Sequence, residues 1–485
     1  VFPLKFLSSS LDWEREGNQV FYRRKFRGSL LFGTNSVVVD SLGFTHNRKE
    51  DWDLFWAMEQ ADPEEKLYLT ITKDFGGFIT TYWEGYFATS EGKFDIDICT
   101  FEVTPLGIDD YTTILEMADI KYNFISGLLA MGTVSTTYGG LPYDYTRTRW
   151  LSRIGSDNVL EFIAQNISPG ATVASDFFTN VTNPITLADN RLLYLTIAQK
   201  SDITRYISSD PASSAMLSWN ELMDILWGMF QVQWTYDPLT NTFTVEHNSY
   251  FESSHPAGID LRQQLSCIAT NKYQYLKDRM PKFENFTMME ADGVNFVGTS
   301  IWYETGGVNQ DPASNTSEFS IPVVTDLEYI LKGGGAGSDE GFVILCPEFD
   351  GVNYTVRGEF GRFDNSFYAL NMDLSIANLQ HDYFRHYRVL PTGYLNGQHV
   401  TFYSSRKTKQ QECSAILCED IDPMAEITTE LGETYFGGAK AIIKTASLSP
   451  SGEMMFALLY GPLPSANPGT PDLFGVSAVP ALTST

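Results

Sequence analysis

The clearest pattern in the chain lies in residues 217–250, where helical spacing of apolar side chains gives way to strict alternation. Ser218 stands three residues before Glu221, the spacing of a capping box, so we expect a helix to begin after Ser218. Apolar side chains then recur at the intervals of one buried helix face. Residues 232–247 alternate apolar and polar positions around a turn at residues 237–241. The pattern predicts a compact helix–hairpin unit whose side chains serve packing.

The opening part of the chain alternates in the same way. Residues 66–72 and 94–103 switch between apolar and polar side chains, and the second run predicts one strand with Asp95 and Asp97 on its solvated face. Because one face of each strand is polar, the pattern indicates antiparallel sheets rather than buried parallel strands. Residues 109–118 are expected to form a helix that closes this unit.

A chain of 485 residues is too long for one hydrophobic core, so we expect several domains. The predicted fold class is α+β and β-dominated, with several small antiparallel sheets or barrels and short helices. The last residues, rich in Pro, Ser and Ala, are expected to lie extended on a neighbour or in solvent. The expected units are a β-rich domain (1–118), an irregular insertion domain (119–205), the helix–hairpin unit (206–260), a second β-rich domain (261–430), a closing β-hairpin (431–461) and the extended tail (462–485).

The charge of the chain is strongly one-sided. It has 33 Lys and Arg against 60 Asp and Glu, a net charge of −27. A surface this acidic repels phosphate, so we expect no grip on nucleic acid through a basic groove. The same charge suits the wall of a conduit that DNA passes without sticking. It also suits simple solubility, and charge alone leaves both interpretations open.

Cysteine, histidine and glycine do not form a recognisable chemical motif. The five cysteines are scattered, which favours synthesis in a reducing compartment; Cys413 and Cys418 lack the second pair of a zinc site. His381 and His386 are five residues apart and would lie on different faces of a helix. The glycine-rich residues 333–337 lack the Lys of a phosphate loop. We therefore expect no cofactor, no metal and no catalytic residue.

The apolar runs are too short for a membrane span, and the first residues lack the layout of a secretion signal.

Carboxylates and tryptophans each allow a structural and a chemical interpretation. Asp95, Asp97 and Glu102 could serve glycoside hydrolysis, with exposed tryptophans stacking on sugars, but a chain this acidic produces such groups by chance. Aromatic side chains also concentrate in cores and at the centres of interfaces. The candidates for core packing or subunit contact are Trp83, Trp219, Trp227 and Trp234.

Three parts of the sequence together resemble a known family. They are residues 26–32 with 82–87 and 94–100, the helix–hairpin unit ending at Phe251, and the late hairpin from Lys444 to Tyr460. They resemble large structural proteins encoded in the tail modules of tailed phages that infect Bacteroidota, including crAss-like phages. Such proteins are similar in architecture to the baseplate hub of contractile-tailed phages, with tube-like β-barrel domains in a ring. The resemblance implies a tube-like first domain and supplies no catalytic residues.

The expected function is therefore that of a structural virion protein and not of an enzyme. The chain would be a tail hub or adaptor subunit, made in the host cytoplasm, that forms a ring with copies of itself and contacts other tail proteins. DNA would pass nearby without specific binding, and no membrane would be involved. The alternative is a glycan-binding or glycan-degrading tail protein that contacts the host surface, since aromatic richness and paired acids also fit that role.

Overall fold

The structure is a computed structural model. It describes residues 5–14, 18–19, 23–33, 37–39, 45–74, 79–108, 111–128, 137–138, 141–142, 148–153, 157–182, 184, 190–199, 215–247, 250–251, 258–264, 268–269, 271–276, 283–288, 300–304, 316–321, 323–324, 341–345, 348–349, 354–355, 392–395, 398–400, 409–417, 425–448 and 453–460. The glycine-rich residues 333–337, His381, His386, Cys418 and the tail from residue 462 lie outside this part of the chain.

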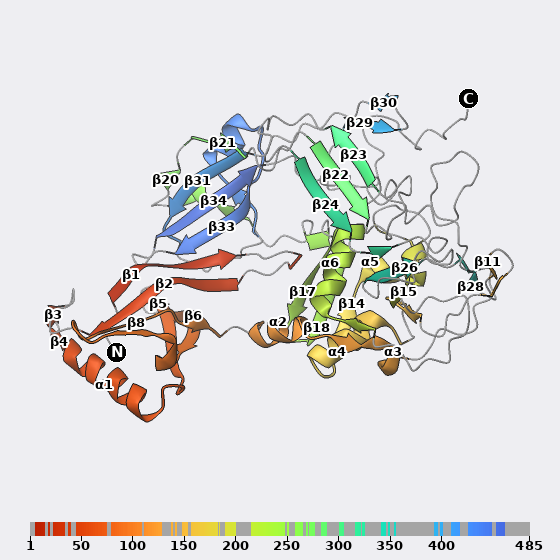
Figure 1. Ribbon diagram of the computed structural model, residues 1–485. Coiled ribbons are helices and arrows are strands. Elements are labelled where there is room, and N and C mark those ends of the chain that lie inside the picture. The colour runs from red at the N-terminus through yellow and green to blue at the C-terminus, as the bar shows by residue number, and fades with distance from the viewer. Residues whose placement is uncertain are drawn as a thin grey trace.

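The largest sheet joins the two ends of the described chain. It has nine strands, and β1, near the N-terminus, pairs antiparallel with the late strand β33. In Figure 1 the red strands β1 and β2 therefore lie beside the blue strands β33 and β34. Its order is β20 (Ile268–Ala269), β31 (Lys409–Ala415), β34 (Met454–Tyr460), β33 (Ile442–Leu448), β1 (Lys5–Glu14), β2 (Arg23–Gly33), β8 (Thr100–Val103) and β7 (Lys93–Asp95), with β21 (Gln274–Tyr275) also on β31.

A second, three-stranded sheet belongs to the same body. Its order is β5 (Leu67–Asp74), β6 (Ile79–Phe87) and β9 (Leu106–Gly107), all antiparallel, and the alternation predicted in β5 is confirmed. Helix α1 (Arg48–Ala61) packs against β2 and β8. One hydrophobic core runs from Phe55 of α1 through Trp83 of β6 to the late strands β31, β33 and β34. The short strands β3 (Val37–Val39) and β4 (Thr45–Asn47) and the 3₁₀ turn η1 (Thr89–Glu91) complete this part.

The hairpin β7–β8 shows that the prediction of a single strand over residues 94–103 is wrong. The Asp95 carboxylate accepts hydrogen bonds from the backbone N–H groups of Asp97 and Ile98, at 3.0 and 3.3 Å. Cys99 has a φ of 51°, in the left-handed region, and the chain reverses between the two strands. A short Asp side chain that binds the backbone ahead of it favours a turn over a strand. The alternation in the sequence did not reveal this competition.

The centre of the chain forms a second body built around helix α6 (Trp219–Phe230). Ser218 and Glu221 make both bonds of the predicted capping box, and Gln231 ends the helix with a φ of 55°. The chain continues into β17 (Val232–Asp237) and β18 (Thr242–His247), which pair antiparallel around the predicted turn. Asn241 closes the turn at a φ of 52°, a conformation that Asn tolerates better than most residues. The helix–hairpin prediction is confirmed.

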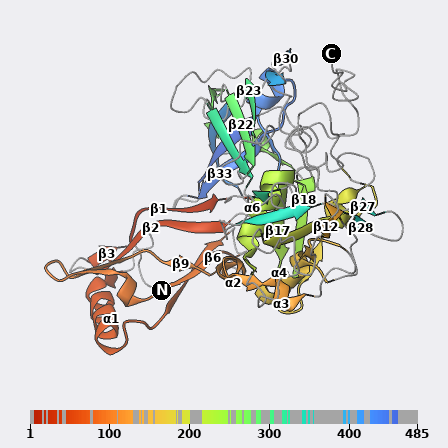
Figure 2. The same cartoon turned by 45° about the vertical axis from the view of Figure 1, so that its right-hand side comes forward.

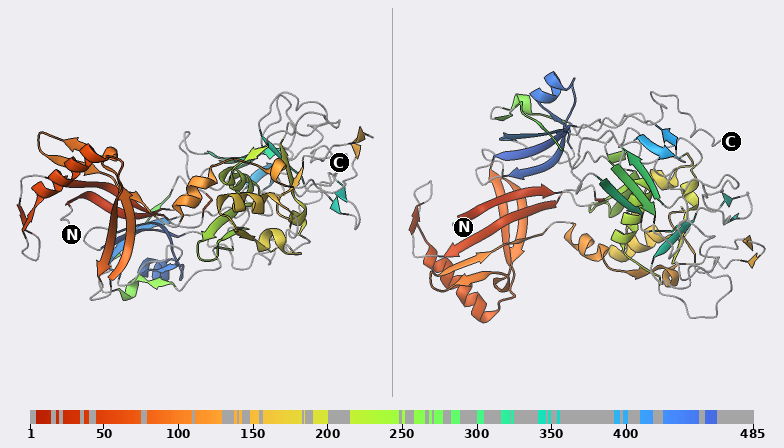
Figure 3. Two further views of the ribbon diagram at one scale, coloured as in Figure 1. Left: turned by 90° about the horizontal axis from the view of Figure 1, so that it is seen from below. Right: turned by 45° about the horizontal axis from the view of Figure 1, so that its top comes forward.

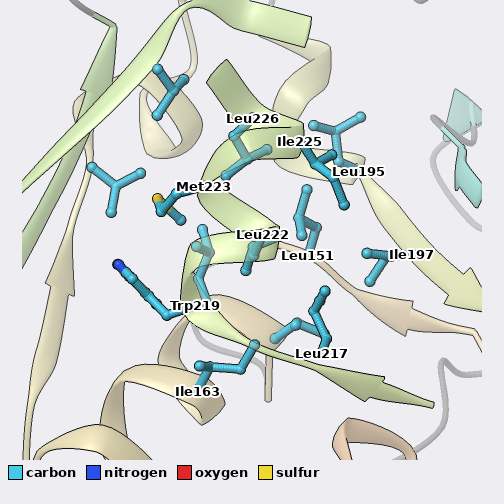
Figure 4. Packing of buried hydrophobic residues seen from close by; sticks show 14 of the residues in the cluster. Leu151, Ile163, Leu195, Ile197, Leu217, Trp219, Leu222, Met223, Ile225 and Leu226 are labelled. Atoms are coloured by element: carbon cyan, nitrogen blue, oxygen red, sulfur yellow. The ribbon is translucent and has the colours of Figure 1, made fainter. Parts of the chain in front are cut away.

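Short elements from residues 111–199 surround this unit. They include helices α2 (Thr112–Ala118), α3 (Phe124–Gly127), α4 (Val159–Ile167) and α5 (Asp176–Thr179), and the 3₁₀ turn η2 (Arg191–Tyr194). The predicted helix over residues 109–118 is confirmed as α2, which begins at Thr112. Figure 4 shows Leu222, Ile225 and Leu226 of α6 among Leu151, Leu195 and Ile197 from this segment. Residues predicted as two neighbouring units, 119–205 and 206–260, thus share one core.

One added strand and three further sheets extend the central body. Strand β14 (Thr172–Ala174) adds parallel to β18, while β10 (Tyr122–Asn123) pairs with β16 (Met216–Leu217). The order of a four-stranded sheet is β13 (Arg149–Trp150), β15 (Thr196–Gln199), β26 (Phe342–Leu345) and β25 (Val323–Val324). That of a five-stranded sheet is β24 (Thr316–Ile321), β22 (Phe283–Met288), β23 (Ser300–Glu304), β29 (Thr392–Leu395) and β30 (Gln398–Val400).

The remaining described elements are short. They are the strand pairs β11 (Thr137–Tyr138) with β12 (Leu141–Pro142), β19 (Ile259–Asp260) with β32 (Ile427–Thr428), and β27 (Glu348–Phe349) with β28 (Tyr354–Thr355), together with the 3₁₀ turn η4 (Leu261–Gln263) and a π-helical turn (Leu431–Tyr435). Figure 2 and Figure 3 show the nine-stranded sheet and α1 on one side and helices α2, α3, α4 and α6 on the other.

The predicted fold class is confirmed, because the chain is β-dominated with small, mostly antiparallel sheets and short helices. The division into six units remains a prediction. Two observations bear on how those units are connected. The nine-stranded sheet takes strands from the ranges 1–118, 261–430 and 431–461, and the central core includes Val323 and residues 343–345.

Candidate assembly surface

The four tryptophans selected from the sequence lie in different environments. Trp83 of β6 is buried in the core between the two N-terminal sheets and the late strands. Trp219 and Trp234 are fully buried in the central core. Trp227 is half-buried on α6. The structure therefore brings Trp219 and Trp234 together and places Trp83 in a separate core, and Trp227 alone of the four retains exposed surface.

Trp219 and Trp234 form the centre of an aromatic cluster. Their ring centroids lie 5.6 Å apart in a T-shaped arrangement, and Phe243 of β18 stands 4.8 Å from Trp219. Such edge-to-face pairs add to the stabilisation from burial. Trp234 donates its Nε1–H to Asn18, whereas no described residue accepts a hydrogen bond from Trp219 Nε1. The cluster packs α6 against the hairpin and leaves no aromatic face open to a ligand.

Asn18, from the connection between β1 and β2, ties the two bodies together. Its Oδ1 accepts from Trp234 Nε1 at 3.1 Å, and its Nδ2 donates to Asp224 Oδ1 at 3.2 Å. The Trp234 backbone N–H donates to the Asn18 carbonyl at 3.1 Å, and Gln19 forms a parallel bridge with Trp234. Asn18 is buried, so both of its side-chain bonds replace water. This contact fixes the N-terminal sheet on the edge of β17.

Glu246 of β18 is the most strongly perturbed carboxyl group in the described core. Burial raises its pKa to about 7. The backbone N–H groups of Asp176 and Phe177 donate to it and lower the pKa, while the charge of Asp176 raises it, and burial outweighs these effects. The carboxyl satisfies the first backbone groups of α5 from a distant strand. His247 is also buried and stacks on Phe177. The arrangement is a long-range helix cap.

The outer face of the sheet β5–β6–β9 carries an exposed apolar row. Tyr68, Tyr86 and Leu106 occupy facing positions on the three strands, and we call them the outer row. Tyr68 is 74% exposed and Leu106 is 46% exposed. The rings of Tyr68 and Tyr86 lie 6.4 Å apart, and Lys66 Nζ lies 4.2 Å from the centre of the Tyr86 ring. The row therefore presents aromatic and aliphatic surface across the whole width of the sheet.

A glycine explains how the outer row becomes continuous. A Cβ atom at Gly85 would lie 2.1 Å from the Trp83 ring and 2.4 Å from the Leu106 carbonyl oxygen. Only glycine allows Trp83 to fold beneath β6 while β9 approaches from the side. Gly85 therefore allows Trp83 to be buried on one face of β6 while Tyr86 and Leu106 lie side by side on the other face.

The edge of this sheet is also open. Within the described residues, β5 pairs with β6 alone, so the backbone groups on its other side have no partner strand. Leu67, Leu69 and Ile71 point toward the core, yet each is only half-buried. An eight-residue strand with a free edge and incompletely covered inner side chains is a site where another strand can add.

A second exposed apolar feature is the tip of the β7–β8 hairpin. Ile96 and Ile98 are 66% and 60% exposed at the turn. Behind the tip, Trp52 and Trp56 of α1 stack 5.6 Å apart, and both contact the Phe94 ring edge-on. The hairpin thus carries two exposed isoleucines on an aromatic base. We call Ile96 and Ile98 the isoleucine tip.

The residues considered for other chemistry do not form a site in the described part of the chain. No group of three or more His, Cys, Asp or Glu side chains there could hold a metal ion. Asp95 shapes the hairpin turn, Asp97 is exposed in it, and Glu102 is exposed on β8.

No helix in the described ranges is long and apolar enough to cross a membrane. Cys99 is half-buried and Cys413 is buried, and within the described residues neither forms a disulfide.

Sequence reasoning missed the outer row, although a signal was present. In residues 66–72 the inward positions are Leu, Leu and Ile, and the outward positions are Tyr68, Thr70 and Thr72. Tyr68 in the outward phase of an alternating strand is such a signal, and it gains meaning only when neighbouring strands add further apolar residues to make a continuous patch. The roles of Asn18 and Glu246 had no such local signal, since their partners are distant in sequence.

Comparisons with known proteins give a partial likeness among solved structures. No protein-family model matches the sequence, and no curated protein matches it either. Among solved structures, the chain is similar to prophage tail protein gp18 from Listeria monocytogenes EGD-e, at 7% sequence identity and a TM-score of 0.28, covering 82% of this chain and 84% of that one. The score is below the range typical of a shared fold, so this likeness by itself shows neither a common fold nor a common function.

Proposed function

We propose that this chain is a structural component of a phage tail. It is a hub or adaptor subunit that forms a closed ring with copies of itself around the path of the DNA, and it catalyses no reaction. The observation that carries the proposal is the apolar surface that the described residues of the N-terminal body leave exposed. The outer row, the free edge of β5 and the isoleucine tip all belong to that body.

Such surfaces have a physical cost for a monomer. Exposed apolar patches and open strand edges promote association, and monomeric proteins usually blunt them with charge or cover them. Here Tyr68, Ile96 and Ile98 are more than half exposed. Asp95 and Asp97 lie in the same turn as the two isoleucines, whereas Tyr68 stands in an exposed row with Tyr86 and Leu106. Contact with a neighbouring subunit is the simplest way to bury them. In a closed ring, every copy uses the same pair of surfaces and none is left over.

The use of aromatic residues supports the same conclusion. The largest ones in the central body, including Trp219, Trp234 and Phe243, are buried against one another. They hold α6 to the hairpin and give the body rigidity. A subunit that must keep its shape while neighbours assemble on it needs cohesion of this kind more than a cleft.

The net charge fits a subunit near DNA. A value of −27 repels the phosphate backbone, so DNA could slide past without being held. The proposed partners are therefore other copies of the chain and other tail proteins, with the virion tail as the location.

Analysis of purified phage particles tests the proposal. Mass spectrometry of the particles should detect this chain as a component present in many copies, and antibody labelling should mark the tail. A chain found only in infected cells and never in particles would overturn it.

Glycan assays distinguish the alternative, a glycan-binding or glycan-degrading tail protein. The purified chain should neither bind a glycan array nor hydrolyse host capsule. Hydrolysis that is lost when Asp95, Asp97 or Glu102 is replaced by its amide would instead establish the carbohydrate function.

A further inference from the structure

We propose that copies of this chain join head to tail, with the outer row of one copy packed against an exposed face of β20, β31, β34 and β33 in the next copy. The inference rests on the proposed function for the presence of neighbouring copies, and it adds which two surfaces meet. Both surfaces lie in the part of the chain that the structure describes.

The second surface is the outward side of the late strands. In β31, β34 and β33, alternate side chains enter the core. The positions between them point outward, and Ile268, Ser414, Met455 and Ser447 form one row across four neighbouring strands. We call this row the late row. Ile268 is 65% exposed and Met455 is 49% exposed, so the late row presents apolar surface between two small serines.

The late row and the outer row lie on different sides of one body. Leu67 and Trp83, on the inner side of the sheet β5–β6–β9, contribute to the same core as Phe456 and Leu458 of β34. Because both inner sides face this core, the two exposed rows point away from it.

Two different contact surfaces on one body allow its copies to join head to tail, which closes a ring when the rotation between copies permits. Contact between two outer rows would instead close a dimer and leave every late row exposed. Head-to-tail contact is the arrangement that covers both rows.

Charged groups accompany the late row in a definite order along β31. Lys444 Nζ donates to Gln410 Oε1 at 3.3 Å, and Gln410 Nε2 donates to Glu412 Oε1 at 3.3 Å. A positive charge therefore lies at Gln410, and a negative charge lies two positions further along the strand. Glu453, just before β34, adds a second carboxylate.

The outer row carries the matching charges along β6. Lys66 Nζ lies 4.2 Å from the centre of the Tyr86 ring, and Glu84 stands two positions before Tyr86 on the same strand. Two positions in a strand span about 7 Å on either face. When β6 and β31 run in the same direction across the contact, Lys66 faces Glu412 and Glu84 faces Lys444. Such complementarity attracts two copies at this contact and fixes their register, although each chain carries a net charge of −27.

Complementation between two variants tests the head-to-tail contact. Tyr68→Asp damages the outer row and Met455→Asp damages the late row, so each variant alone should associate about 30-fold or more weakly than the wild type. In an equimolar mixture, the intact late row of the first variant can meet the intact outer row of the second. The mixture should therefore form one-to-one dimers and nothing larger in sedimentation velocity and native mass spectrometry.

The same mixture shows that both variants are folded, because each must present one intact surface to form the dimer. Leu239→Asp is the matched control. Leu239 is 94% exposed at the turn between β17 and β18, and this substitution should leave association unchanged.

A charge exchange tests the register. Lys66→Glu and Glu412→Lys should each weaken association about tenfold, and a chain that carries both should recover to within about threefold of the wild type. Glu116→Lys, at an exposed position of α2, changes the net charge as Glu412→Lys does and should have no effect.

The outcomes distinguish this inference from the proposed function. Wild-type rings that persist in Met455→Asp, a mixture that stays monomeric, or a charge exchange without recovery would overturn the inference while the ring stands. Dimers formed by Met455→Asp alone would also overturn it, because they would show contact between two outer rows. A wild-type chain that remains monomeric at every concentration would overturn the ring and this inference together.

Discussion

At the scale of single residues, the two central tryptophans differ in one bond. Trp219 and Trp234 are equally buried and pack against each other, but only Trp234 donates its Nε1–H to a described acceptor, Asn18. A Trp→Phe substitution removes similar apolar volume at either position. At Trp234 it also leaves the buried Asn18 oxygen without that donor, which costs extra stability.

We therefore expect Trp234→Phe to lower the free energy of unfolding by about 1 kcal/mol more than Trp219→Phe does. Urea unfolding of the two variants measures the difference, and each variant is the control for the other. Equal losses would show that the Asn18 bond contributes nothing.

Glu246 gives the central body a dependence on pH. Its pKa is about 7 in the folded chain and about 4.5 when unperturbed. Between these values the unfolded chain releases the proton while the folded chain keeps it. The free energy of unfolding should therefore fall as pH rises from about 4.5 to about 7, by at most ~3 kcal/mol.

Glu246→Gln should flatten this decline, since the amide does not ionise. Thermal unfolding across the pH range measures the slope. Asp237→Asn is the control on the same hairpin; hydrogen bonds from Thr240 and Leu239 lower the pKa of Asp237, so it titrates below the window. A decline unchanged in Glu246→Gln would assign the pH dependence to other groups.

At the scale of elements, the start of α6 depends on its capping box. The Ser218 Oγ accepts from the Glu221 backbone N–H at 3.2 Å, and the Glu221 carboxylate accepts from the Ser218 N–H at 3.1 Å. Ser218→Ala should lower the free energy of unfolding by about 1 kcal/mol, as loss of an N-cap does elsewhere. Ser218→Thr keeps the acceptor and should cost much less. If the two variants unfold alike in urea, the cap has no role in stability.

The elements also show what periodicity can and cannot predict. The helix–hairpin unit and β5 have strong local signals, namely a capping box and strict alternation, and the structure contains both. The β7–β8 hairpin has the same alternation, yet the Asp95 carboxylate binds the backbone of Asp97 and Ile98 and reverses the chain. Two hydrogen bonds accepted by one side chain decided between strand and turn, and the alternation of apolar and polar residues does not reveal them.

At the scale of the whole molecule, the contacts that organise the bodies were beyond sequence reasoning. β1 pairs with β33 near the other end of the chain, and Asn18 binds Trp234 from 216 positions away. Neither contact leaves a periodic trace in either segment. The candidate tryptophans could be selected for packing, but which core each would enter required these long-range pairings.

Asn18 provides a test of how strongly the bodies are coupled. Asn18→Ala removes the partner of the Trp234 Nε1–H and of Asp224, so it should lower the free energy of unfolding by about 2 kcal/mol. It should also separate thermal unfolding into two transitions, because the contact between the bodies loses both of its side-chain bonds and keeps only backbone bonds among those described. The control is the exposed Asn166, whose described side-chain bond goes to the Phe162 carbonyl within α4, and Asn166→Ala should leave a single transition. A single, unshifted transition in Asn18→Ala would show that the contact does not couple the bodies.

We propose that this chain buries its exposed apolar surfaces by assembling with copies of itself. Negative-stain electron microscopy of the purified full chain tests this most directly. We expect closed rings with one fixed number of copies, lost or broken when Tyr68→Asp places a charge on the outer row. Single, separate particles at every concentration, unchanged by Tyr68→Asp, would show that the chain does not assemble through this surface.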